Sequence, residues 1–156
     1  MIYLIFLFLD NSIKIWSLEN FTLKKTLNKH SHKISSLSLS SDNNYILSSS
    51  YDSLLYLWDL KKPEKPRAFK AHTRPVFSGA ISNDNRLIIS GGADKNVYLW
   101  NVIGEAKACS QVHTGFVNKV QFNPGFPGIF FSCSEVFIYH MHLSYRLILG
   151  LKNYWL

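Results

Sequence analysis

The sequence predicts an all-β fold built from repeated units of about 42 residues, and three observations support this prediction. Tryptophan recurs every 42 residues, at Trp16, Trp58 and Trp100, each time six positions after an aspartate. Short segments such as residues 34–39 and 97–100 alternate between apolar and other side chains, which is typical of strands. No segment keeps the period of 3.6 residues that an amphipathic helix requires.

Other residue types keep the same period. Besides the Asp–Trp pairs, the recurring residues are His30 and His72, Asp42 and Asp84, and Ser48 and Ser90. The segments 41–44 and 83–85 are rich in Asn and Asp, which tolerate the backbone of tight turns. Biased composition alone would not hold several residue types in step, so the period indicates a structural repeat.

A histidine, a serine, an aspartate and a tryptophan recurring in this order resemble the WD40 repeat, from Asp10 to about Ser134. The resemblance implies four-stranded antiparallel blades arranged as a β-propeller. It also implies one hydrogen-bonded tetrad per blade, formed by His30, Ser48, Asp52 and Trp58, and by His72, Ser90, Asp94 and Trp100. Because a buried carboxylate is costly unless charge-assisted bonds satisfy it, we expect these tetrads to be structural clamps.

The anchors divide the chain into a partial first blade (1–28), two complete blades (29–71 and 72–112), and a degraded fourth blade with an apolar tail (113–156). Phe6 stands where the first blade should have its serine. Val136 and His142 stand where the fourth blade should have Asp and Trp. Since propellers usually close with four to eight blades, we expect an incomplete, open propeller of about three to four blades.

An open array of blades loses burial at its ends. If one missing neighbour exposes on the order of 400 Å² of apolar surface, about 10 kcal/mol of stabilisation is lost. That is as much as the whole stability of a typical domain. We therefore expect a truncated or divergent copy, or one segment of an incomplete gene product. Pairing of two chains to complete a ring is the alternative.

Two segments narrow the resemblance. Residues 30–60 and 84–104 resemble the second and third blades of the receptor-for-activated-C-kinase family, the Gβ-like proteins of the eukaryotic small ribosomal subunit. Residues 113–133 resemble the fourth blade of that family, with about one residue deleted. This resemblance implies a cytoplasmic scaffold on the small subunit, linked to translation and kinase signalling. That family anchors to ribosomal RNA through a basic-Asp-basic turn, where this chain has Leu9, Asp10 and Asn11.

The net charge of +7 favours acidic partners, such as nucleic acid, anionic lipid or acidic protein surfaces. The partner-binding candidates on the face of the histidine-anchored loops are Lys33, Tyr51, Arg74, Lys95 and Lys119. A second basic segment, residues 61–67, should form an exposed turn on the opposite face. We expect protein partners and, from the resemblance, ribosomal RNA and small-subunit proteins. The basic residues could supply salt-sensitive contacts with phosphates, but no base-reading module is visible.

Catalysis is not expected. Ser, His and Asp could form a catalytic triad, but here the set recurs once per blade, and no G-x-S-x-G elbow surrounds Ser48 or Ser90. The sequence contains no phosphate-binding loop and no zinc-ligand spacing, so we expect neither a metal nor a cofactor. The histidine pairs His30 with His32 and His140 with His142 are weak evidence for a metal.

Cys109 and Cys133 form no CxxC motif, which is typical of a reduced, intracellular protein. Residues 1–9 are all apolar but lack the features of a signal peptide and are far shorter than the ~20 residues of a membrane span. A buried strand is the prediction for this segment, and no membrane association is expected.

The leading functional hypothesis is therefore a non-catalytic protein-interaction scaffold. The alternatives are another WD40 adaptor, in RNA processing or in a ubiquitin ligase complex, an enzyme, and a non-functional remnant.

Overall fold

The computed structural model describes residues 3–7, 10–111, 113–126, 128–136 and 144–150. This part of the chain forms fourteen strands and no helix, so the all-β prediction is confirmed. The strands are β1 (Tyr3–Leu7), β2 (Ser12–Ser17), β3 (Leu23–Asn28), β4 (Ile34–Leu39), β5 (Tyr45–Ser50), β6 (Leu55–Asp59), β7 (Arg67–Phe69), β8 (Val76–Ile81), β9 (Leu87–Gly92), β10 (Val97–Asn101), β11 (Ala106–Ser110), β12 (Val117–Phe122), β13 (Phe130–Val136) and β14 (Ser144–Gly150).

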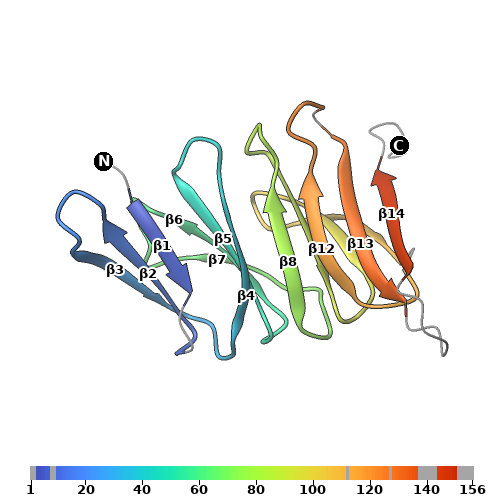
Figure 1. Ribbon diagram of the computed structural model, residues 1–156, viewed down its shortest axis with the longest axis horizontal. Coiled ribbons are helices and arrows are strands. Elements are labelled where there is room, and N and C mark those ends of the chain that lie inside the picture. Colours follow the sequence, from blue (N-terminus) through green and yellow to red (C-terminus); the bar gives the residue numbers. More distant parts are fainter. Residues whose placement is uncertain (1–2, 8–9, 112, 127, 137–143, 151–156) are drawn as a thin grey trace.

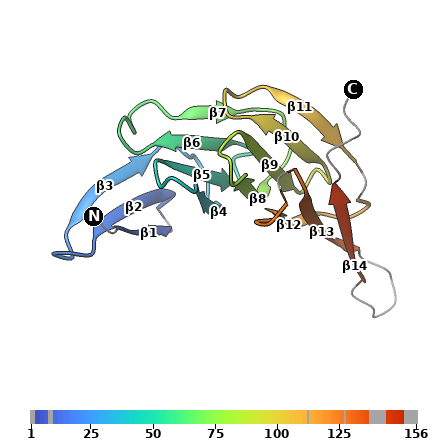
Figure 2. The ribbon, with the colours of Figure 1, turned by 90° about the horizontal axis from the view of Figure 1, so that it is seen from above.

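The strands form four antiparallel sheets that follow the chain, with the orders β1-β2-β3, β4-β5-β6-β7, β8-β9-β10-β11 and β12-β13-β14. The sheets stand side by side (Figure 1). Seen from above, they fan out along an arc, with β4, β8 and β12 on its inner side and β3, β7 and β11 on its outer rim (Figure 2). The fold is therefore an incomplete, open propeller of four blades, as the repeat predicted.

Strand register shows which strands are equivalent. Ser48 pairs with Tyr56 and Ser90 with Tyr98, and in each case the tryptophan follows two residues later. In the first sheet the same place is taken by Phe6, which pairs with Lys14 two residues before Trp16. Strands β1, β5 and β9 are thus equivalent. Within the described residues the first sheet lacks a counterpart of the innermost strands β4 and β8, and the fourth lacks one of the outer strands β7 and β11.

The prediction for the fourth blade was wrong in one respect. Trp100 pairs with Ile88, and the equivalent pair of the fourth sheet is Gly150 with Phe130. The position of the tryptophan therefore falls on Gly150, and His142 lies outside the described residues. The reason is the spacing, because β10 begins five residues after the end of β9, whereas β14 begins eight residues after the end of β13. The segment expected to be a tail thus includes the third strand of this sheet.

Neighbouring sheets pack through three apolar clusters. The cluster between the first and second sheets is built from Ile13, Ile15, Leu27, Ile34, Ile46, Tyr56 and Trp58. The next contains Leu47, Leu55, Leu57, Phe69, Val76, Ile81, Ile88 and Trp100, and the third Ala80, Ile89, Val97, Val117, Val120 and Phe122. Each sheet thus buries its side chains against its neighbours, as stacked repeats do.

The inner strands also approach one another closely. A Cβ atom on Gly91 of β9 would lie 2.4 Å from Cγ1 of Val117, so only glycine permits this contact between the third and fourth sheets. Serine hydroxyls of β4 accept hydrogen bonds from the backbone of β8, where Gly79 donates to Ser36 and Ile81 to Ser38, both at 3.3 Å. The serines of β4 therefore link two blades.

The apolar N-terminal segment contains β1, which pairs with β2, and Ile5 of β1 packs at the edge of the first cluster. In the part of the chain that the structure describes, no helix is long and apolar enough to cross a membrane.

Candidate functional site

The structure brings the four predicted residues of the second sheet together. His30 Nδ1 lies 2.7 Å from Asp52 Oδ2, and His30 Nε2 lies 2.7 Å from Ser48 Oγ. The indole Nε1 of Trp58 donates to the same Ser48 oxygen at 2.8 Å. The carboxylate of Asp52 also accepts the backbone N–H groups of Ser31 and Leu54, at 3.1 and 3.0 Å. These bonds join the loop before β4, strands β5 and β6, and the turn between them.

The third sheet repeats this arrangement almost atom for atom. His72 Nδ1 lies 2.9 Å from both carboxylate oxygens of Asp94, and Nε2 lies 2.8 Å from Ser90 Oγ. Trp100 Nε1 donates to Ser90 Oγ at 2.9 Å. The side chain of His72 is fully buried, and that of Asp94 is 2% exposed. A cluster that recurs in both central sheets, with its polar atoms bonded to one another, is a clamp within each of these blades.

The surroundings of the two histidines favour their neutral form. Burial lowers the pKa of His30 and of His72, although the neighbouring aspartates oppose this shift. A neutral imidazole that carries its proton on Nδ1 donates to the aspartate and accepts at Nε2 from the serine hydroxyl. The serine oxygen then still accepts from the tryptophan. Every donor in this series of hydrogen bonds, from the aspartate to the tryptophan, meets an acceptor, as buried polar groups require.

The first and fourth sheets contain only parts of the tetrad. In the first, the indole N–H of Trp16 is buried without a hydrogen-bond partner among the described residues, because Phe6 stands at the serine's register position. In the fourth, His113 Nε2 lies 2.8 Å from Ser132 Oγ. Val136 is the last residue of β13 and pairs with Ser144, so the aspartate's position is part of a strand there.

A shallow cavity lies on the face of the histidine-anchored loops. Its volume is about 380 Å³, and its lining residues are Lys33, Ser35, Tyr51, Phe77, Phe116, Asn118 and Glu135. The rings of Tyr51 and Phe77 are 5.6 Å apart, and those of Phe77 and Phe116 are 6.1 Å apart. Lys33 Nζ lies 5.7 Å from the centre of the Tyr51 ring. We call this row of three rings with Lys33 and Glu135 the aromatic groove.

The aromatic groove contains two of the five predicted partner-binding candidates, Lys33 and Tyr51. Tyr51 is 42% exposed. Arg74 and Lys95 are exposed in the loop before β8 and in the turn between β9 and β10, outside the groove lining. Lys119 is exposed within strand β12, and not in a loop. Two of the five candidates thus line the aromatic groove, and the other three are exposed outside its lining.

Sequence reasoning missed Phe77 and Phe116. Ser35, Phe77 and Asn118 occupy equivalent places, since the register of the inner strands β4, β8 and β12 shifts at these residues. Such bulges redirect a side chain, and here they turn three equivalent side chains into one cavity. The available signal for Phe77 was its position in the repeat, one residue after the first residue of an inner strand, where residue type varies between blades. Phe116 directly precedes β12 and is not covered by this signal.

The described residues contain no group of three or more His, Cys, Asp or Glu side chains that could hold a metal ion. The sequence profile of the WD domain, G-beta repeat, matches residues 21–59 and 63–101, together half of the chain. The chain belongs to the WD40 family. Each matched WD40 repeat contains the outer strand of one sheet and the first three strands of the next, which are β3 with β4–β6 and β7 with β8–β10. Each repeat thus ties two blades together.

A comparison of the WD40 chain with curated proteins finds no match. WD40 repeats typically form scaffolds that bind other proteins, and the family is generally non-catalytic.

Proposed function

We propose that this WD40 chain is a non-catalytic scaffold for protein–protein interaction, and that the aromatic groove receives a partner. The observation that carries the proposal is the contrast between the tetrads and the groove. The polar atoms of the tetrads bond to one another inside the blades, whereas Tyr51 and Phe116 are 42% and 37% exposed. Exposed aromatic side chains are the residues that most often anchor a partner at an interface.

The composition of the groove favours a segment with an apolar side chain between polar or charged neighbours. Three rings offer apolar contact area. Lys33 and Glu135 place opposite charges among the lining residues, and Asn118 adds an amide that donates and accepts hydrogen bonds. Such an arrangement fits a protein loop better than a small substrate, because the cavity is shallow and holds few converging polar groups.

The more specific proposal is a scaffold associated with the small ribosomal subunit and linked to kinase signalling and translation, located in the cytoplasm. Support comes from the resemblance of residues 30–60, 84–104 and 113–133 to the receptor-for-activated-C-kinase family and from the net charge of +7. The proposed partners are kinases, signalling or translation factors, small-subunit proteins and ribosomal RNA. The exposed cations Arg74, Lys95 and Lys119 would contribute salt-sensitive contacts.

Co-sedimentation with purified small ribosomal subunits at low and high salt tests the specific proposal. We expect association at low salt that weakens as salt rises. We also expect it to weaken when Tyr51→Ala and Phe116→Ala are combined. The control is Ile103→Ala, because Ile103 is 61% exposed between β10 and β11, outside the groove lining. Absence of association at low salt would contradict the ribosomal assignment and favour another WD40 adaptor role.

A further inference from the structure

The outer strand of the first sheet and the residue that follows it contain three lysines. Lys24 and Lys25 lie within β3, and Lys29 follows its last residue. Because β3 is the end strand in the order β1-β2-β3, its outer edge pairs with no other strand of the described chain. Such an edge presents main-chain N–H and C=O groups to which an additional strand can bind.

A groove of about 340 Å³ runs along this edge. One wall consists of the consecutive residues 25–29, and the other of Trp58, Pro63, Glu64 and Pro66. Since alternate residues of a strand point to opposite faces, a wall of consecutive residues places the groove at the edge of β3 and not on one face of its sheet. Lys25 Nζ donates to the carbonyl oxygen of Leu60 at 2.6 Å, which fixes β3 beside the connection between β6 and β7.

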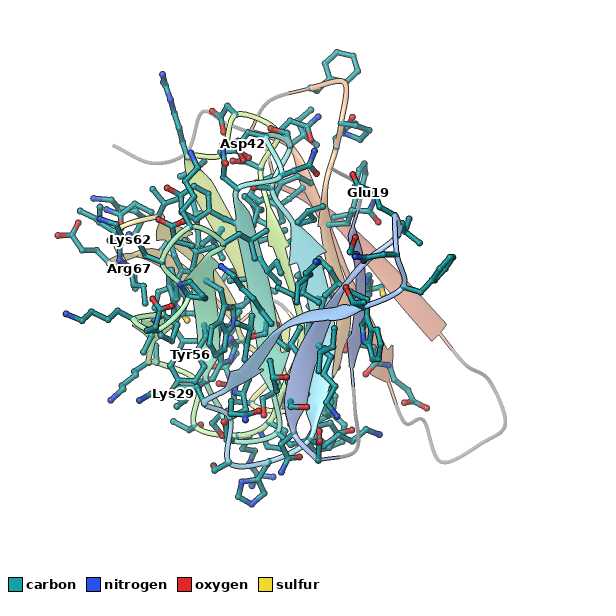
Figure 3. All side chains as sticks on the ribbon, turned by 90° about the vertical axis from the view of Figure 1, so that its left-hand side faces the viewer. Glu19, Lys29, Asp42, Tyr56, Lys62 and Arg67 are labelled. Atoms are coloured by element: carbon teal, nitrogen blue, oxygen red, sulfur yellow. The ribbon has the colours of Figure 1, made fainter. Side chains whose placement is uncertain are left out.

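Exposed lysines also flank the far wall. Lys61, Lys62 and Lys65 are exposed in the β6–β7 connection and flank the groove residues Pro63 and Glu64. Lys29, Arg67 and Lys62 follow one another along the same side of the molecule in Figure 3. The acidic residues of these two segments, 22–29 and 59–67, are Asp59 and Glu64. Positive charge therefore predominates along the groove.

The other two outer strands differ from β3. Strand β7 has three residues, and its Arg67 donates to the carbonyl of Val102, which directly follows β10 of the neighbouring sheet. On β11, Lys107 forms an ion pair with Glu105 at 3.3 Å. Lysines on an edge strand also hinder aggregation, but that role needs neither a groove nor a second basic wall.

We propose that this groove binds an acidic, extended segment of a partner protein, which pairs with the outer edge of β3. In this mode, main-chain hydrogen bonds supply affinity and side-chain contacts supply specificity. Carboxylates of the segment would meet Lys29 of the lining and the exposed lysines beside the groove, Lys24 on β3 and Lys62 on the β6–β7 connection. Single-stranded RNA is less suitable, because it needs exposed rings on which bases stack. The one aromatic side chain in the lining is Trp58, which is 2% exposed and bonds to Ser48.

Fluorescence anisotropy with a labelled peptide of about eight alternating Glu and Val residues tests the proposal. The comparison peptide has the same sequence with alternate backbone nitrogens methylated, so that its charge is kept and its strand pairing is lost. We expect binding of the first peptide to weaken with salt, and the second to bind about tenfold more weakly. Binding should also protect the β3 amides against hydrogen exchange.

Charge reversal locates the site. We expect Lys24→Glu combined with Lys29→Glu to weaken peptide binding about tenfold, and Lys107→Glu on β11 to change it less than about twofold. Tyr51→Ala should leave it unchanged, which separates this site from the aromatic groove. Circular dichroism of each variant checks that it folds. Equal binding of both peptides, equal loss with Lys107→Glu, tighter binding of an oligouridylate of similar length, or no binding below about 1 mM would each overturn the proposal.

Discussion

Trp58 donates its indole hydrogen to Ser48 at 2.8 Å, and the same serine oxygen lies 2.7 Å from Nε2 of His30. One fully buried hydroxyl therefore joins strands β5 and β6 to the loop that enters the blade. Trp100, Ser90 and His72 repeat this relationship 42 residues later. The period of the sequence is thus the period of a hydrogen-bonded clamp.

Ser48→Ala should destabilise the fold more than a serine substitution nearby. It leaves the Trp58 N–H and the His30 Nε2 without their partner, and each stranded group costs about 1–3 kcal/mol. Urea unfolding measures the loss. The control is Ser31→Ala, because Ser31 is exposed beside His30 and its backbone N–H, which bonds to Asp52, is retained. Equal stability of the two variants would show that the Ser48 hydroxyl is not a structural link.

Trp58→Phe should cost more stability than Trp16→Phe, by about 1–2 kcal/mol. Both changes remove an indole N–H, but the one on Trp58 is bonded to Ser48, whereas the one on Trp16 is buried without a partner. Thermal unfolding of both variants gives the comparison. A larger loss for Trp16→Phe would contradict the view that the first sheet has lost its clamp.

Acid should destabilise the fold in the pH range in which His30 and His72 become protonated. Burial holds the pKa of His30 and His72 below the ordinary value of 6.5, so the unfolded chain binds more protons than the folded chain just below that pH. Stability contributed by these groups is therefore complete above about pH 6.5 and falls as the pH drops toward their folded pKa values.

Urea unfolding between about pH 7 and pH 5 measures this dependence, and a variant with His30→Gln and His72→Gln is the comparison. We expect the variant to be less stable at neutral pH and to lose less stability on acidification. The same slope in both proteins would mean that these histidines do not change their protonation on unfolding in this range.

Gly91→Ala should weaken the packing of the fourth sheet on the third. The new Cβ atom would lie 2.4 Å from Val117 Cγ1, and relieving such overpacking costs about 1–3 kcal/mol. Adding Val117→Ala should restore part of the loss relative to Val117→Ala alone. Gly125→Ala is the control, because its Cβ atom would have no neighbour closer than 3.6 Å. Unfolding midpoints that do not distinguish Gly91→Ala from Gly125→Ala would refute this contact.

The sequence predicts the second and third blades well, because the residues of each tetrad recur at the same spacing within a single repeat. Each tetrad needs one side chain of a defined type at each of four positions, and both blades keep the same spacing between them. The fourth blade was harder, because Ser132 and His113 persist while the connection after β13 is longer than in the other blades. A fixed period then assigned the tryptophan's place to His142, although strand pairing assigns it to Gly150.

The aromatic groove could not be predicted in the same way. Phe77 and Phe116 come from separate blades: Phe77 lies at the bulge of β8, and Phe116 directly precedes β12, so their contact depends on how the two sheets pack. The bulged position is not occupied by one residue type in all blades, so a search for recurring residues does not reveal it. The basic segment 61–67 was predicted to be exposed, but its position opposite β3 depends on how one sheet packs on the next.

The central claim is that the histidines belong to closed networks inside the blades, and nitrogen-15 NMR of the imidazole rings tests it most directly. At neutral pH we expect His30 and His72 to be uncharged, with the proton on Nδ1, bare Nε2 atoms, and Nδ1 protons that exchange slowly with water. Rings that carry the proton on Nε2, or that exchange it rapidly while titrating like a free imidazole, would contradict the account.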